Sequence, residues 1–210
     1  MKVLLLNGSP HKNGCTYTAL CEVAKSLNDN NIETEIFYPG LNIKPCMACR
    51  ACSKLGKCVI DDKVNEFVEL AKNADGFVFG TPVHYASASG LITSFLDRVF
   101  FSGCCGGHYD YFRGKPGASV VSCRRSGSTF TFDQINKYFT ISEMPIISGR
   151  YWNMVHGHTP DEVKQDLEGM QNLRILGKNM AYFLKCKELG EKNGIKFPEQ
   201  EEIVFTNFIR

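Results

Sequence analysis

Two periods of apolar and polar positions alternate along the chain, one typical of buried strands and the other of amphipathic helices. Short segments that are apolar throughout, or apolar at every second position, predict strands at residues 3–6, 33–38, 76–80, 118–123 and 144–147. Apolar residues spaced three and four positions apart predict helices at residues 16–28, 61–71, 88–101, 132–139 and 161–187. Glycine, proline and other turn-forming residues separate most of these segments.

Strands and helices therefore follow one another five times, which predicts an α/β fold with a single doubly wound, five-stranded parallel sheet. We assign residues 1–190 to this domain and residues 191–210 to a C-terminal extension. Residues 41–60, after the second strand, show neither period and hold four cysteines, so we interpret them as a long functional loop.

Ligands of a doubly wound sheet bind beyond the carboxyl ends of its strands. We therefore expect three loops to meet at one site, namely residues 8–16, 81–85 and 124–128. Thr16 is expected to cap the helix that follows the first loop. Asp97 and Arg98 are expected to lie off the apolar stripe of the helix at residues 88–101.

The first of these loops has the composition of an anion site. A buried strand runs into a polar, glycine-bearing loop and then a helix start, where unpaired N–H groups and the helix dipole favour a phosphate. The loop does not match the dinucleotide fingerprint or the P-loop, and no cysteine begins a Cys-x5-Arg phosphatase loop. The remaining alternative is an ordinary strand-to-helix turn. The candidate phosphate-binding residues are Ser9, His11, Asn13, Gly14, Cys15 and Thr16.

Residues 8–16, GSPHKNGCT, resemble the GSPRxxGNT-type phosphate loop of the flavodoxin-like NAD(P)H-dependent FMN reductases. His11 stands where that family usually has arginine, and Cys15 stands where it has asparagine or serine. The resemblance implies bound FMN, NAD(P)H as the electron donor and the flavodoxin-like strand order 2-1-3-4-5.

Two later segments extend the resemblance to nearly the whole chain. Residues 81–85, TPVHY, resemble a TPVYY-like run that contacts the flavin ring, and residues 124–127, RRSG, resemble an RRxG segment near the ring edge. His84 and Tyr85 have a simpler alternative role, as a hydrogen-bonded pair that covers the end of the sheet. The implied ring-binding residues are Pro82, Val83, His84, Tyr85, Arg124 and Gly127.

Residues 151–157, YWNMVHG, resemble a YWNxVHG segment of a subset of these oxidoreductases. Trp152 in this segment either closes over the flavin ring, of its own or a neighbouring subunit, or is a core residue under the last helix.

Four cysteines lie together with the spacing C-x2-C-x2-C-x5-C, namely Cys46, Cys49, Cys52 and Cys58. Zinc sites usually pair two short cysteine knuckles across a longer span, whereas this compact run is closer to the cysteines that hold a [4Fe–4S] cluster. The same arrangement marks the iron-sulfur flavoproteins. A cluster, redox-active or inert thiols, and zinc remain the three alternatives. We interpret the other six cysteines as small apolar residues.

The composition and charge of the chain limit the classes of partner that it can bind. The 210 residues carry a net charge of +2, without the basic stripe that nucleic acid binding requires. No apolar run approaches the ~20 residues of a membrane span, and no signal sequence is recognisable, so we expect a cytoplasmic protein that binds neither membrane nor nucleic acid.

The sequence thus predicts an FMN-containing, NAD(P)H-dependent oxidoreductase that passes electrons through a [4Fe–4S] cluster to a small-molecule or protein acceptor. The alternatives are a plain FMN, quinone or nitro reductase without a cluster, a non-enzymatic flavodoxin-type carrier, and a cysteine-based sensor. No acid/base constellation identifies a catalytic residue. Apolar residues left over in the cysteine loop, around Trp152 and at residues 203–205 predict a homodimer or homotetramer.

Overall fold

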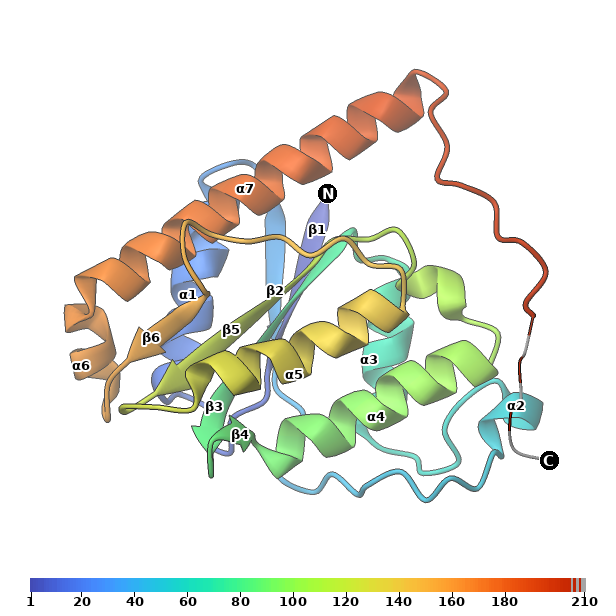
Figure 1. The fold of residues 1–210 in the computed structure, drawn as a ribbon, viewed down its shortest axis with the longest axis horizontal. Helices are drawn as coiled ribbons and strands as arrows, with labels where there is room; N and C mark the ends of the chain where they lie inside the picture. The colour runs from blue at the N-terminus through green and yellow to red at the C-terminus, as the bar shows by residue number, and fades with distance from the viewer. Residues whose placement is uncertain (205, 207, 209–210) are drawn as a thin grey trace.

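Five parallel strands form the centre of the computed structural model, which describes residues 1–204, 206 and 208 (Figure 1). Their order is β2-β1-β3-β5-β6, which is the predicted flavodoxin-like order, because β4 is only a short antiparallel strand on β3. The strands are β1 (Lys2–Asn7), β2 (Glu33–Phe37), β3 (Gly76–His84), β4 (Ser87–Ala88), β5 (Gly117–Cys123) and β6 (Met154–His156).

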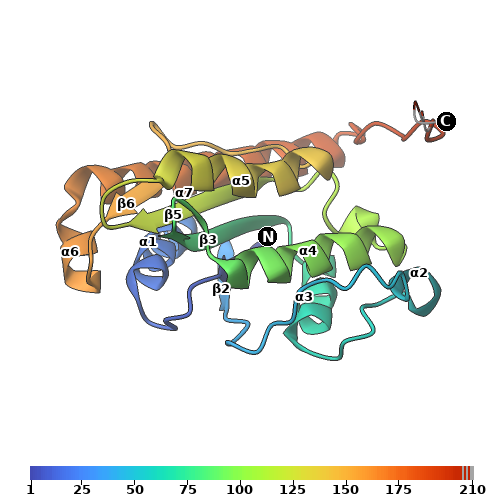
Figure 2. The same cartoon turned by 60° about the horizontal axis from the view of Figure 1, so that its bottom comes forward.

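Helices cover both faces of this sheet (Figure 2). Helices α1 and α7 bury their apolar sides against one face, and α3, α4 and α5 bury theirs against the other. The helices are α1 (Cys15–Asn28), α2 (Cys52–Leu55), α3 (Lys63–Lys72), α4 (Gly90–Cys105), the 3-10 helix η1 (Tyr109–Tyr111), α5 (Ser128–Ile141), α6 (Pro160–Gln165) and α7 (Leu167–Lys192).

Strand β1 shows why the first apolar run is continuous. Val3 and Leu5 belong to the core beneath α1 and α7, whereas Leu4 and Leu6 belong to the core on the opposite face. Successive side chains of a strand point to opposite faces, so a strand covered on both faces must be apolar at every position. The second core is rich in phenylalanine, and Phe79 stacks on Phe139 with ring centroids 5.0 Å apart.

Two predicted strands are placed differently in the structure. Strand β3 continues through residues 81–84, which we had predicted to be a loop, because Thr81 and Pro82 still pair with β5. The fifth strand is residues 154–156, and the prediction of residues 144–147 was wrong: only Ile146 there makes a bridge to β5. Between residues 147 and 154 the chain lies outside the sheet, and Asn172 of α7 bonds the backbone of Tyr151 and Trp152 there.

The predicted helices also need two corrections. The long helix at residues 161–187 is two helices, because Asp166 leaves the helical conformation and its carboxylate accepts a hydrogen bond from the Gly169 N–H, which caps α7. Gly14 rather than Thr16 occupies the N-cap of α1. Asp62 caps α3, since its carboxylate accepts from the Val64 N–H at 3.1 Å.

The residues after α7 form no helix or strand among those the structure describes. Phe197 lies under the guanidinium of Arg113, 4.8 Å from its ring centroid. Ile203 and Val204 are exposed, and Phe205, the third residue of the apolar run predicted to dock on a partner or an edge, lies outside the described residues. The division into residues 1–190 and 191–210 stays a prediction. None of the described helices is long and apolar enough to span a bilayer.

Lys115 generates a prediction about pH. Its ammonium donates to the carbonyls of Ala71 and Lys72 at the end of α3, and burial lowers its pKa to about 8. Because the unfolded chain holds this proton more tightly, the charged form penalises the folded state below pH 8, and the penalty disappears as the pH rises towards 10.5. The free energy of unfolding of the wild type, relative to Lys115→Met, should rise by about 1 kcal/mol over this window, after discounting for partial exposure. Denaturant titrations at both pH values measure this difference, and a flat difference would contradict the assignment.

Candidate functional site

The loops after β1, β3 and β5 meet at the carboxyl edge of the sheet, as the sequence predicts. The Gly8 N–H donates to the Gly80 carbonyl at 2.8 Å. Ser89, the N-cap of α4, donates from its hydroxyl to the Gly8 carbonyl at 2.8 Å and from its N–H to the Thr81 hydroxyl at 3.2 Å. One buried serine therefore joins the first loop, the end of β3 and the start of α4.

The first loop is held in shape by its own side chains. The Asn7 carboxamide accepts from the Ser9 N–H at 3.2 Å and donates to the Lys12 carbonyl at 2.9 Å. The Ser9 hydroxyl is buried and accepts from the His11 N–H at 3.1 Å. His11 and Asn13, in contrast, are exposed at the loop surface. The backbone of the loop is thus set before any ligand binds.

Helix α1 begins without a side-chain cap, because its N-cap is Gly14. Helix α5 begins in the same way at Gly127, whereas α3, α4, α6 and α7 are each capped by a side chain, among the residues the structure describes. The unpaired N–H groups and positive dipole ends of α1 and α5 are free to face an anion. Both helices start at loops that we predicted to bind the flavin.

Two predicted phosphate ligands turn out to be partly engaged elsewhere. Thr16 is buried, and its hydroxyl lies 2.8 Å from that of Ser122 on β5, which leaves its backbone N–H as the group at the loop. The Cys15 thiol is directed at the Gly157 carbonyl, 3.9 Å away, and burial raises its pKa. Both residues can therefore contact a phosphate mainly through their backbone N–H groups.

The predicted ring-binding segments touch each other. Tyr85 and Ala86 form the turn between β3 and β4, both with positive φ (48° and 58°). A β-carbon on Gly127, which itself has φ +89°, would lie 2.6 Å from the Ala86 α-carbon. Non-glycine residues pay about 1–2 kcal/mol in this conformation, so such strain often accompanies a functional loop. Tyr85 and His84 are exposed, so the alternative of a pair that covers the sheet end is wrong.

Trp152 lies half-exposed just before the start of β6, the outermost strand, so the interpretation as a core residue under the last helix is wrong. Its ring meets that of Tyr151 edge-on, with centroids 4.4 Å apart. Both rings line a pocket with His156 and Asp166, whose side chains approach to 3.5 Å. Closure of Trp152 over a flavin ring stays a prediction.

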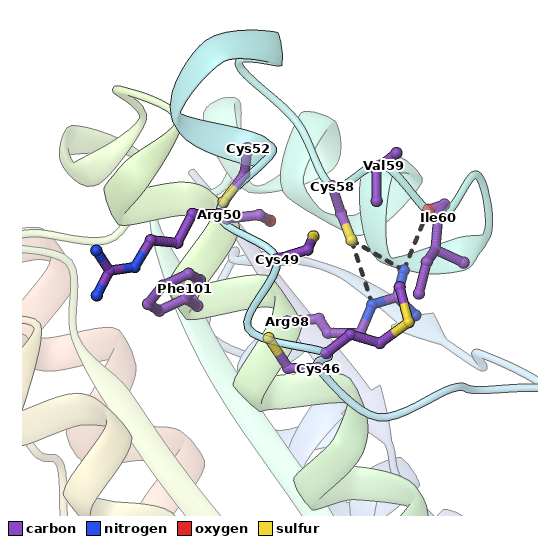
Figure 3. A pocket seen from close by; sticks show the side chains of 11 residues that line it. Cys46, Cys49, Arg50, Cys52, Cys58, Val59, Ile60, Arg98 and Phe101 are labelled. Atoms are coloured by element: carbon purple, nitrogen blue, oxygen red, sulfur yellow. Dashed lines mark hydrogen bonds between the residues drawn. The ribbon is translucent and has the colours of Figure 1, made fainter.

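The four loop cysteines line a second pocket, against α4 (Figure 3). Ala48 and Arg50, on either side of Cys49, have positive φ (51° and 55°), and the chain turns there. The Arg50 side chain points away from the sulfur atoms (Figure 3). The wall that α4 contributes consists of Arg98, Phe101 and Ser102.

Sequence reasoning missed two polar groups in this wall. Arg98 is 1% exposed although it carries a charge, and it forms an ion pair with Asp62 at 2.6 Å. Ser102, one turn later, is also buried, and its hydroxyl has no hydrogen-bond partner among the described residues. Arg98 falls off the apolar stripe of α4, whereas Ser102 lies on it, three residues after Val99. The spacing of one turn between Arg98 and Ser102 is the sequence signal that could have indicated both.

Two further cysteines lie near this pocket. Cys104 and Cys105 are exposed at the end of α4, and Cys186 is exposed on α7, so the interpretation of these three as small apolar residues is wrong. Burial raises the pKa of the Cys52 thiol, and the nearby thiol of Cys105 raises it further. Among the described residues, no three cysteine, histidine, aspartate or glutamate side chains converge closely enough to bind one metal ion.

Comparison with known proteins places this geometry in a family. The model of the family described as NADPH-dependent FMN reductase matches residues 1–159. The chain belongs to this family. An iron-sulfur flavoprotein of Methanocaldococcus jannaschii is 30% identical over 198 residues, covering 88% of this chain and 98% of the relative. An iron-sulfur flavoprotein of Methanosarcina thermophila is 30% identical over 199 residues, covering 92% and 98%.

Solved structures confirm the flavodoxin-like fold of this FMN reductase family member. RosB with its bound intermediate 8-demethyl-8-formylriboflavin-5'-phosphate has a TM-score of 0.69 at 14% identity and covers 100% of this chain and 94% of its own. A flavodoxin from the domain Archaea has a TM-score of 0.59 at 16% identity and covers 88% and 99%. Family membership supports FMN binding and flavin oxidoreductase activity.

The contact between the two ring loops of this FMN reductase family member predicts the effect of Gly127→Ala. The new methyl group would meet the Ala86 backbone at 2.6 Å and separate the loops, so FMN affinity should fall at least tenfold. Gly194→Ala is the matched control, because Gly194 has φ +85° but no atom within 4 Å of a β-carbon. Flavin fluorescence titration compares the two variants, and equal affinities would show that the loop contact does not shape the site.

The phosphate loop predicts the effect of Asn13→Asp. This change adds a negative charge at an exposed loop position, and like charges about 4 Å apart repel by about 1–4 kcal/mol near a protein surface. FMN binding should weaken about tenfold, whereas binding of riboflavin, which lacks the phosphate, should not change. Asn193→Asp, at the end of α7, adds the same charge elsewhere and should change neither. Equal weakening of FMN and riboflavin would refute a phosphate contact.

Proposed function

We propose that the chain is an FMN-containing, NAD(P)H-dependent oxidoreductase that passes electrons through a [4Fe–4S] cluster held by Cys46, Cys49, Cys52 and Cys58. The single observation that carries the proposal is the arrangement of these four cysteines around one pocket, against the helix whose N-terminus lies in the flavin loops. The family description and the names of the archaeal relatives support the nicotinamide donor and the cluster.

The residues of the pocket fit such a cluster. Four thiolates from one compact loop are the usual donor set, and hydrogen bonds to sulfur are a usual feature of the surroundings. The buried Ser102 hydroxyl, without a partner among the described residues, supplies an unused donor in the same pocket. The compact C-x2-C-x2-C-x5-C spacing argues against zinc, whose sites usually pair two short cysteine knuckles across a longer span.

In this proposal the residues of the chain bind and orient the flavin. The N-termini of α1 and α5 bind the phosphate and the electron-rich edge of the flavin through backbone N–H groups. Arg124, exposed beside the start of α5, adds a positive charge at that edge. A bound flavin supplies hydride acceptance from the nicotinamide and return of electrons singly or in pairs.

A plain FMN, quinone or nitro reductase without a cluster is the second candidate. The observation that favours it is the exposure of Cys46 and Cys49, which would be labile ligands. A non-enzymatic carrier is less well supported, because carriers usually present an acidic docking face and this chain has a net charge of +2. A homodimer or homotetramer and a cytoplasmic location stay predictions.

Iron content tests the proposal. Protein purified and reconstituted without oxygen should contain about four irons and four sulfides per chain, with a broad visible absorption beneath the flavin bands. Cys49→Ser should lose most of this iron. Cys186→Ser, which removes an exposed cysteine of α7 outside the pocket, should retain it and is the matched control.

Two outcomes would contradict a [4Fe–4S] cluster in this pocket. The wild type could bind FMN and oxidise NAD(P)H while taking up no iron, which would identify the plain reductase. Equal iron in the two cysteine variants would instead show that the metal binds outside the pocket.

A further inference from the structure

Arg98 is a charged side chain buried in the wall of the cysteine pocket. It lies in the middle of α4, and its side chain, 1% exposed, reaches into the segment between residues 44 and 62. Burial of an unpaired guanidinium would cost several kcal/mol, so its partners indicate what it does.

Asp62 neutralises the charge of Arg98. Its two carboxylate oxygens accept from Nη1 and Nη2 at 2.6 and 2.9 Å, the bidentate geometry in which arginine pairs most strongly. The carbonyls of Lys44 and Ile60 accept from the same two nitrogens at 3.3 and 3.1 Å. These four bonds suffice to hold the cysteine loop against α4.

The remaining bonds go to a sulfur atom. Nε and Nη2 of Arg98 lie 3.4 and 3.3 Å from the Sγ atom of Cys58, and Figure 3 shows both bonds. A neutral thiol is a weak acceptor, whereas a thiolate, free or bound to iron, accepts well. The Ser102 hydroxyl lines the same pocket without a partner among the described residues. The two hydrogens of Nη2 are shared among Cys58, Ile60 and Asp62, whereas the single hydrogen of Nε is directed at the sulfur alone.

We propose that Arg98 is a positioning residue, which holds Cys58 as a cluster ligand and raises the reduction potential of that cluster. This inference rests on the proposed function. The step concerned is the addition of one electron, supplied by the reduced flavin, to the oxidised cluster, and no bond at Cys58 forms or breaks. Reduction adds a negative charge, and N–H···S hydrogen bonds from a cation stabilise the more negative state.

Three variants of the full chain separate this role from a mere loop clamp. Arg98→Met removes the cation and both bonds to Cys58. Asp62→Asn removes a negative charge but keeps Arg98, and its amide oxygen can still cap α3. The double variant lacks the bonds to sulfur, yet its net charge equals that of the wild type.

The measurement is the reduction potential of the cluster in anaerobically reconstituted protein, by redox titration followed in electron paramagnetic resonance. In Arg98→Met we expect reduction to become at least tenfold less favourable, a shift of about 59 mV to more negative potential. The double variant should keep this shift. Asp62→Asn should not move the potential in the negative direction.

If Arg98→Met has the wild-type reduction potential, Arg98 only clamps the loop, and the inference is overturned. If the double variant returns to the wild-type potential, net charge rather than the bonds to sulfur sets the potential, and the inference is overturned as well. If Arg98→Met retains no iron, Arg98→Lys takes its place. It keeps the charge but not the planar fork, so an intermediate potential supports the inference and an unchanged one overturns it. A wild type without iron would overturn the proposed function as well, whereas a loaded wild type with an insensitive potential overturns this inference alone.

Discussion

The whole structure depends on the burial of a parallel sheet on both of its faces. Val3 and Leu5 of β1 pack beneath α1 and α7, and Leu4 and Leu6 pack beneath the helices of the other face. Because the strands are parallel, the chain must return to the same end of the sheet before each new strand, and helices on the two faces make these connections. The carboxyl ends of all five parallel strands consequently share one edge. The turns that leave this edge are the parts of the chain that are free to bind a ligand.

Helix α4 connects the two candidate sites. Its N-cap, Ser89, bonds two of the three flavin loops, and its wall of the cysteine pocket begins at Arg98. Nine residues of α-helix separate these positions, which is about 14 Å along the axis. Because the helix is packed in the phenylalanine-rich core, its wall of the cysteine pocket keeps a fixed position relative to the flavin loops that Ser89 bonds.

The sequence by itself determined the fold class and the loops that meet, and its resemblance to the FMN reductases implied the order of the strands. Continuous apolar runs and helical stripes are local patterns, and the chirality of the crossovers leaves few ways to join them. It also grouped Cys46, Cys49, Cys52 and Cys58, because ligands on one loop are neighbours in the chain. The prediction of an edge strand at residues 144–147 was wrong, because residues 154–156 pair with the end of β5 instead, and which segment pairs at an edge depends on contacts that are distant in sequence.

Only the tertiary structure decided which polar residues face the sites. The 3.6-residue period places Arg98 outside the apolar stripe but does not say whether that side meets solvent or another segment, and here the cysteine loop covers it through Asp62 and Cys58. Thr16 is a plausible ligand by position, yet its hydroxyl bonds Ser122 inside the protein. In each case the partner lies tens of residues away, and burial makes the hydrogen bond obligatory, so neither outcome can be read from local pattern.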